Sequence, residues 1–189
     1  TQVAVAHQRT SPRVSGRPVK IASLATYVPP HVLTNADLEK MVDTSDQWIQ
    51  QRTGIRERDI VDPGMATSDL GTQAAIKAIE KAGLKPDDIG VIVVGTVTPD
   101  MFFPSTACLI QTKIGAHHAW GFDLSAACSA FTFALTTASQ MVASGAHEHA
   151  LVVGADVMSS IIDYKDRSTC VLFGDGAGAV VLPAAEPGE

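Results

Sequence analysis

The feature of this sequence that most constrains its fold is a regular alternation of short apolar segments with longer amphipathic ones. Residues 90–96, Gly-Val-Ile-Val-Val-Gly-Thr, form an apolar run that is too short for a helix and is typical of a strand covered on both faces. Residues 67–82 have helical character, and Gly83 and Pro86 favour a helix end directly after them. Strands that alternate with helices predict an α/β fold, in which a mostly parallel sheet is sandwiched by helices.

The other segments extend this pattern. Strands are predicted at 19–28, 55–61, 119–124 and 150–154, helices at 105–114 and 129–144, and a glycine-rich strand pair at 172–182. Thr34 and Thr44 each precede an acid or amide by three residues, so a short helix is expected to begin at each. Segment 119–124 is expected to be buried, whereas the alternation in 55–61 predicts an exposed strand that gives Arg56 and Arg58 a solvated face.

Residues 174–178, Gly-Asp-Gly-Ala-Gly, could be mistaken for a phosphate-binding loop. They precede the strand-like residues Ala-Val-Val-Leu, so no helix N-terminus and no Lys-Ser/Thr pair follow to hold a phosphate. We therefore interpret this segment as a tight turn between strands, with glycines where backbones pack closely.

The composition fits a globular core and excludes several classes. With 189 residues, of which 46% are hydrophobic, the chain can bury one substantial core, and no apolar run approaches the length that spans a bilayer. A net charge of −6 gives no general attraction to nucleic acid. The three cysteines are widely spaced without a CxxC pair, which argues against a disulfide framework or a metal site and favours a reducing compartment such as the cytoplasm.

The first 18 residues differ from the rest of the chain. They have no helical or strand period, and Arg9, Arg13 and Arg17 precede every acidic residue, of which the first is Asp37. We expect residues 1–18 to be a disordered extension and residues 19–189 to form the folded domain. An arginine-bearing, acid-free leader has some likeness to a plastid transit peptide, but it lacks a strong amphipathic pattern, so a cytoplasmic leader is favoured.

Cys128 is the main candidate for chemistry. It follows the strand-like segment 119–124 and directly precedes the amphipathic segment 129–144, so it is expected at a helix N-terminus. Unpaired backbone N–H groups and the helix dipole at that position stabilise a thiolate and can bind an oxyanion. The alternative is that Cys128 is a small buried apolar residue, as most free cysteines are.

Four separated stretches together resemble a known family. They are residues 34–58, the cysteine run 123–135, Ala150-Leu-Val-Val-Gly-Ala-Asp156 and residues 166–178. In order and spacing they resemble β-ketoacyl-acyl-carrier-protein synthase III, the condensing enzyme that starts type II fatty acid synthesis. The resemblance implies the N-terminal half of a thiolase-like fold, which has two pseudo-symmetric halves. It also implies that the catalytic histidine and asparagine belong to the absent C-terminal half, since no histidine of this chain stands in a matching context.

The resemblance also implies roles for individual residues. Cys128 is the nucleophile, and Trp48 stacks on the adenine of coenzyme A with Arg167 on the opposite face. Arg52 and Thr44 belong to the same coenzyme A site. Phe103, Met158 and Phe173 match acyl-pocket positions, with Phe103 reaching the pocket of the neighbouring subunit in a homodimer. One departure is Ala130, which stands where the family usually has glycine and puts the chain-length preference in doubt.

The implied reaction needs no cofactor and has two stages. Cys128 takes an acyl group from a short acyl-CoA, first of all acetyl-CoA, and malonyl-acyl-carrier protein then decarboxylates and attacks the acyl-enzyme. Without the histidine and asparagine, this chain alone is expected to be inactive in condensation. The alternatives are another thiolase-fold enzyme (3-hydroxy-3-methylglutaryl-CoA synthase, or a starter-unit or quinolone synthase), a non-catalytic dimerising fragment, and a cysteine hydrolase, which the histidine contexts disfavour.

Overall fold

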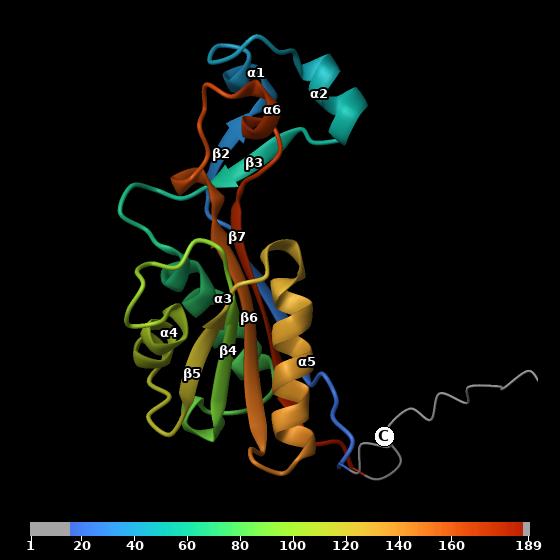
Figure 1. Cartoon of the computed structure of the whole chain (residues 1–189), viewed down its shortest axis with the longest axis vertical. Coiled ribbons are helices and arrows are strands. Elements are labelled where there is room, and N and C mark those ends of the chain that lie inside the picture. Colours follow the sequence, from blue (N-terminus) through green and yellow to red (C-terminus); the bar gives the residue numbers. More distant parts are fainter. Residues whose placement is uncertain (1–15, 187–189) are drawn as a thin grey trace, which may run out of the picture.

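A five-stranded sheet forms the centre of the protein, as the computed structural model shows for residues 16–186 (Figure 1). Its strand order is β1-β7-β6-β4-β5. β4 runs parallel to β5 and β6, and β7 runs antiparallel to both of its neighbours, so β7 alone opposes the other strands. The predicted mostly parallel α/β sheet is confirmed. The strands are β1 (Ser23–Tyr27), β4 (Val91–Gly95), β5 (Trp120–Leu124), β6 (His149–Val157) and β7 (Asp175–Pro183).

Helices cover both faces of this sheet. α3 (Thr67–Lys81) and α4 (Thr106–Ile114) pack on one face, and α5 (Ala130–Ala143) packs on the other (Figure 1). The residues of β4 alternate between the two cores: Ile92 and Val94 join the α3 and α4 side, and Val91 and Val93 join the α5 side. Each such buried side chain stabilises the fold by about 1.5–3 kcal/mol. The prediction of a strand covered on both faces is therefore confirmed.

A smaller unit lies at one end of the sheet, at the top of Figure 1. It contains the antiparallel pair β2 (His31–Thr34) and β3 (Glu57–Ile60) with the short helices α1 (Asn35–Leu38), α2 (Asp46–Thr53) and α6 (Arg167–Cys170). Its own core is formed by Leu38, Ile49, Cys170 and Val171. Within residues 16–186, no helix is long and apolar enough to cross a membrane.

The two predicted helix starts have different outcomes. The capping box at Thr34 is confirmed, because Thr34 Oγ1 accepts from the Asp37 N–H while Asp37 accepts from the Thr34 N–H. The second start is one residue later than predicted. Ser45, not Thr44, caps α2, and Ser45 Oγ accepts from the Trp48 N–H at 3.1 Å.

Two strand predictions need correction. Residues 120–124 form an edge strand that pairs only with β4 within the described chain and is partly exposed, so segment 119–124 is not a buried strand. Residues 175–183 form one continuous strand between β1 and β6, where a strand pair was predicted. Gly176 and Gly178 lie inside this strand, so the interpretation of 174–178 as a turn was wrong. Glycine inside a strand can also mark a site where a ligand or another backbone approaches closely.

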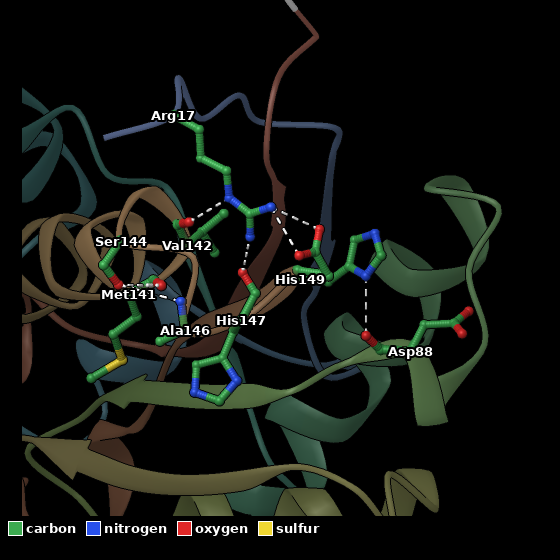
Figure 2. Close-up of polar contacts among 9 residues, drawn as sticks. Arg17, Asp88, Met141, Val142, Ser144, Ala146, His147 and His149 are labelled. Carbon is green, nitrogen blue, oxygen red and sulfur yellow. Dashed lines mark hydrogen bonds and ion pairs between the residues drawn. The ribbon is translucent and has the colours of Figure 1, made fainter. Parts of the chain in front are cut away.

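Arg17 contacts the domain, although residues 1–18 were predicted to be a disordered extension. Arg17 donates from Nε to the Val142 carbonyl at 2.9 Å and from Nη2 to the His147 carbonyl at 2.7 Å (Figure 2). Its Nη1 forms an ion pair with Glu148 at 2.8 Å. A cation at the C-terminal end of α5 is also favoured by the helix dipole. The rest of the predicted extension, residues 1–15, lies outside the described residues.

Candidate functional site

Cys128 lies in a tight turn that joins β5 to α5. The turn is the 3-10 helix η2 (Ala127–Ser129), and Ala127 has a φ of +46°, a left-handed conformation that non-glycine residues rarely adopt. Within the described residues, the backbone N–H of Cys128 makes no hydrogen bond. The turn thus presents a thiol and a free N–H beside the start of a helix, as the sequence predicted for the thiol.

The environment of the three cysteines separates their roles. Cys128 is exposed, Cys108 is partly buried, and Cys170 is buried. Burial raises the pKa of the Cys170 thiol, which keeps it protonated and unreactive. Cys108 accepts a hydrogen bond from Ser105 Oγ at 3.2 Å at the start of α4. The accessible thiol next to a helix start is therefore Cys128, and the interpretation as a buried apolar residue is wrong.

A groove of about 430 Å³ opens beside Cys128. Its walls come from the turn, the first turn of α5 and the sheet, and the glycines Gly95, Gly154 and Gly178 of three adjacent strands leave room for it. Gly95 is needed for a further reason. A Cβ there would lie 2.8 Å from the Ala130 carbonyl carbon and 2.9 Å from the Phe131 nitrogen. The missing side chain allows the start of α5, and with it Cys128, to rest on β4.

Asp156 also lines the groove and was not singled out as a site residue from the sequence. Its Oδ1 accepts from Thr96 Oγ1 at 2.9 Å, from the Val97 N–H at 2.8 Å and from Thr98 Oγ1 at 2.9 Å. These bonds fix the loop that leaves β4. The signal in the sequence was an acid at the end of an otherwise apolar strand, inside a stretch that the family resemblance had already covered.

The four predicted coenzyme A residues lie together in the smaller unit. The Arg167 guanidinium carbon is 4.5 Å from the centroid of the Trp48 ring, and that of Arg52 is 5.8 Å from it. A small cavity of about 240 Å³ is lined by Thr44, Trp48 and Arg167 with Asp43 and Ser45. Thr44 Oγ1 is buried and has no hydrogen-bond partner within the described residues, so it can bind an added polar group.

Local hydrogen bonds hold Arg167 at this place. Asp166 caps α6, accepting from the Ser168 N–H at 2.9 Å and from Thr169 Oγ1 at 2.8 Å, and hydrogen bonds from these two residues lower the pKa of Asp166. The helix therefore begins at Arg167. The space between Arg167 and Trp48 is too narrow for a base in this structure. A purine stacked between the guanidinium and the indole needs these two planes about 7–8 Å apart, whereas the guanidinium carbon is 4.5 Å from the ring centroid. A bound base would require the Arg167 side chain to swing outward.

The three predicted acyl-pocket residues do not line the Cys128 groove within this chain. Phe103 is 88% exposed and stands next to Phe102, which is fully exposed, on the loop after β4. Met158 is partly buried in η3 (Met158–Ser160), and Phe173 is 39% exposed. Their pocket roles stay predictions.

No histidine lines the Cys128 groove within the described residues. His147, His149 and His117 sit at the end of the sheet where β4, β5 and β6 begin, whereas Cys128 follows the end of β5. There His117 pairs with Asp87 at 3.1 Å, and His149 contacts the Asp88 carbonyl at 3.1 Å (Figure 2). The described residues also contain no group of three potential metal ligands. The described chain supplies Cys128 with neither a histidine base nor a metal.

Comparisons with known proteins agree with this arrangement. The family model described as 3-oxoacyl-[acyl-carrier-protein (ACP)] synthase III matches residues 122–189. The β-ketoacyl-[acyl-carrier-protein] synthase III of Koribacter versatilis is 59% identical over 175 residues, which are 93% of this chain and 53% of that protein. The corresponding protein of Solibacter usitatus is 58% identical over 90% of this chain and 51% of its own length. The resemblance to β-ketoacyl-acyl-carrier-protein synthase III that the sequence predicted is confirmed.

Solved structures extend the likeness to the fold. The Aquifex aeolicus synthase III has a TM-score of 0.86 at 49% identity, over 89% of this chain and 54% of that chain. The priming β-ketosynthase of the R1128 polyketide pathway has a TM-score of 0.88 at 38% identity, over 90% of this chain and 51% of that chain. The predicted thiolase-like half is confirmed. The chain spans about half the length of the synthase III relatives that it matches.

Proposed function

We propose that this chain carries the nucleophile and the coenzyme A site of a β-ketoacyl-acyl-carrier-protein synthase III. The observation that supports this best is Cys128, an accessible thiol with a free backbone N–H at the start of α5, in a chain 59% identical to a synthase III. The proposal keeps the predicted division into an extension, residues 1–18, and a half-domain, residues 19–189, and the second half of the relatives completes the catalytic centre. A homodimer in the cytoplasm belongs to the same proposal.

The first stage uses residues of this chain. The Cys128 thiolate attacks the thioester carbonyl of an acyl-CoA, and the N–H of Cys128 donates to the oxyanion that forms. The carbon–sulfur bond to coenzyme A breaks, and coenzyme A leaves as its thiolate, which takes up a proton. The product is an acyl group on Cys128. Acetyl-CoA is the first substrate to test, since a two-carbon group makes the smallest demand on the groove.

The second stage forms the new carbon–carbon bond. Malonyl-acyl-carrier protein loses carbon dioxide, the resulting carbanion equivalent attacks the acyl carbonyl, and the Cys128 thiolate leaves. Decarboxylation needs donors that stabilise the developing enolate. No histidine lines the Cys128 groove within the described residues, so this stage depends on the histidine and asparagine that the family resemblance assigns to the second half.

Intact-mass analysis after incubation with acetyl-CoA tests the first stage. We expect a single acetyl addition on Cys128, abolished in Cys128→Ala and also in Cys128→Ser, since an alkoxide forms much less readily than a thiolate. Cys108→Ala is the matched control and should still be acetylated. The measurement is made on residues 1–189 and on a chimaera that adds the remaining half of the Koribacter versatilis relative. Acetylation of Cys108 or Cys170 that survives Cys128→Ala would refute the assignment.

The nucleotide site is tested by removing each stacking surface. Trp48→Ala and Arg167→Ala should each weaken coenzyme A binding by about 1–3 kcal/mol, the usual loss when a base loses its stacking partner. The same variants should accept an acetyl-pantetheine thioester, which lacks the nucleotide, nearly as well as the parent does. Equal losses with both donors in folded variants would mean that Trp48 and Arg167 shape the protein and do not contact adenine.

A further inference from the structure

Arg58 is buried without a counterion, although the sequence predicted a solvated side chain. It is 4% exposed, and no carboxylate forms an ion pair with it within residues 16–186. Its Nη1 donates to Asn35 Oδ1 and its Nη2 donates to the Val171 carbonyl, while Nε has no partner there. Burying a cation in this way is costly, and this cost lowers the pKa of Arg58. Such a residue calls for an explanation beyond packing.

One arm of Arg58 leads to the helix that carries Trp48. Asn35 accepts from Arg58 with its oxygen, so its Nδ2 is directed elsewhere and donates to Asp46 Oδ1 at 2.7 Å and to the Ile55 carbonyl at 2.9 Å. Asp46 is the first residue of α2, two positions before Trp48. The hydrogen bond from Asn35 is also the main cause that lowers the pKa of Asp46. This arm therefore holds the start of α2.

The other arm leads to the helix that carries Arg167. Val171 is the C-cap of α6, and Arg167 is the first residue of the same four-residue helix. The hydrogen bond from Arg58 to the Val171 carbonyl therefore holds the C-terminal end of α6. The N-terminal end of α6 carries Arg167, which lines the cavity opposite Trp48. Since Nη1 and Nη2 belong to one planar guanidinium, the two arms have a fixed separation.

We propose that Arg58 is a positioning residue that sets the distance between Trp48 and Arg167, and through it the preference for acyl donors that carry the nucleotide of coenzyme A. The inference rests on the proposed function, which assigns the nucleotide to these two residues. Arg58 itself touches neither face of the cavity. Its effect on the reaction passes through Asn35 and Val171.

Arg58→Lys tests the proposal, because an ammonium group keeps the charge but cannot bridge both acceptors. In the chimaera described above, the rate constant kcat/KM for acyl transfer to Cys128 is measured with acetyl-CoA and with acetyl-pantetheine. We expect the preference for acetyl-CoA to fall about tenfold, through KM, because a charged hydrogen bond is lost. Arg56→Lys is the matched control: Arg56 is exposed in the same segment and should leave the preference unchanged.

Two further variants separate the possible failures. Asn35→Ala cuts only the arm to α2 and should lower the preference in the same direction, so it provides the test if Arg58→Lys does not fold. In a Trp48→Ala background, Arg58→Lys should cause no further loss of preference, since the feature it positions is gone. An unchanged preference in Arg58→Lys or Asn35→Ala, while Trp48→Ala lowers it, overturns the role of Arg58 and leaves the nucleotide site intact. An unchanged preference in Trp48→Ala overturns the nucleotide site itself.

Discussion

Gly95→Ala is expected to displace Cys128, because the added methyl group would push against the start of α5. Gly95 ends β4, which is held between β5 and β6 and cannot shift easily. A Cβ at this position would lie 2.8 Å from the Ala130 carbonyl carbon, 2.9 Å from the Phe131 nitrogen and 3.0 Å from the Ala130 Cβ. These are backbone or backbone-attached atoms, so no flexible side chain can turn away. The start of α5 has to move instead.

The size of the effect follows from these distances. Carbon atoms in contact prefer about 3.5–4.0 Å, so the first turn of α5 must lift by roughly 0.5–1 Å. Overpacking of this kind costs about 1–3 kcal/mol of stability. A displacement of about 1 Å at a reacting group can also lower its rate by roughly a hundredfold. Cys128 lies two residues before Ala130 and moves with it.

Urea denaturation of residues 1–189 measures the stability loss, and the rate of acetylation in the chimaera measures the displacement. Gly178→Ala is the control for stability, because Gly178 lines the same groove but its added Cβ would meet only the Ala25 carbonyl oxygen, at 3.9 Å. We expect the control to stay within about 0.5 kcal/mol of the parent. Equal stabilities of the two variants, or unchanged acetylation in Gly95→Ala, would refute the argument that Gly95 seats the nucleophile.

Two further predictions concern stability. Arg17→Ala should destabilise the protein by about 1–2 kcal/mol in thermal unfolding, since it removes hydrogen bonds to two carbonyls. Glu148→Gln should cost less than about 0.5 kcal/mol, because the Glu148 side chain is 71% exposed. Similar losses of stability in the two variants would contradict this prediction. Hydrogen bonds from Thr34 and Lys40 lower the pKa of Asp37 from 3.8 to about 2, so its stabilising contribution is complete above pH 3.8 and is lost as the pH falls through 2. Asp37→Asn should therefore differ from the parent in unfolding curves at pH 5 and converge with it towards pH 2.

The sequence predicted the elements whose signals are local. The β4 run, the capping box at Thr34 and the turn-to-helix position of Cys128 each depend on neighbours within a few residues. Arg58 could not be placed in the same way. Alternation in β3 assigns it to one face, but that face is buried by Val171, which is 113 residues away in the chain. Whether a strand face is solvated is decided by such distant partners.

The glycines of β7 show the same limit. Gly174, Gly176 and Gly178 were interpreted as a turn, because the sequence cannot tell a chain reversal from a strand that lacks side chains for another reason. In the structure, Gly178 lies beside Gly154 and helps to form the Cys128 groove, while Gly174 lets β7 pass the backbone of Asp59, whose oxygen would be 3.0 Å from an added Cβ. The glycines thus serve the site and the junction of the two units.

The spacing between the thiol and the nucleotide cavity is set by rigid contacts. β6 lines the Cys128 groove and then leads through η3 to α6 and Arg167, and β7 returns from α6 into the sheet. At the base of this excursion Asp175 is 5% exposed and accepts from the Ser159 N–H at 2.8 Å, from Ser159 Oγ at 2.6 Å and from the Val61 N–H at 2.9 Å. One buried carboxylate therefore ties the end of β3, η3 and the start of β7 together. In the proposed reaction, this carboxylate would help to fix the distance that the pantetheine arm of coenzyme A spans, and the proposed role of Arg58 is limited to the far end of that span.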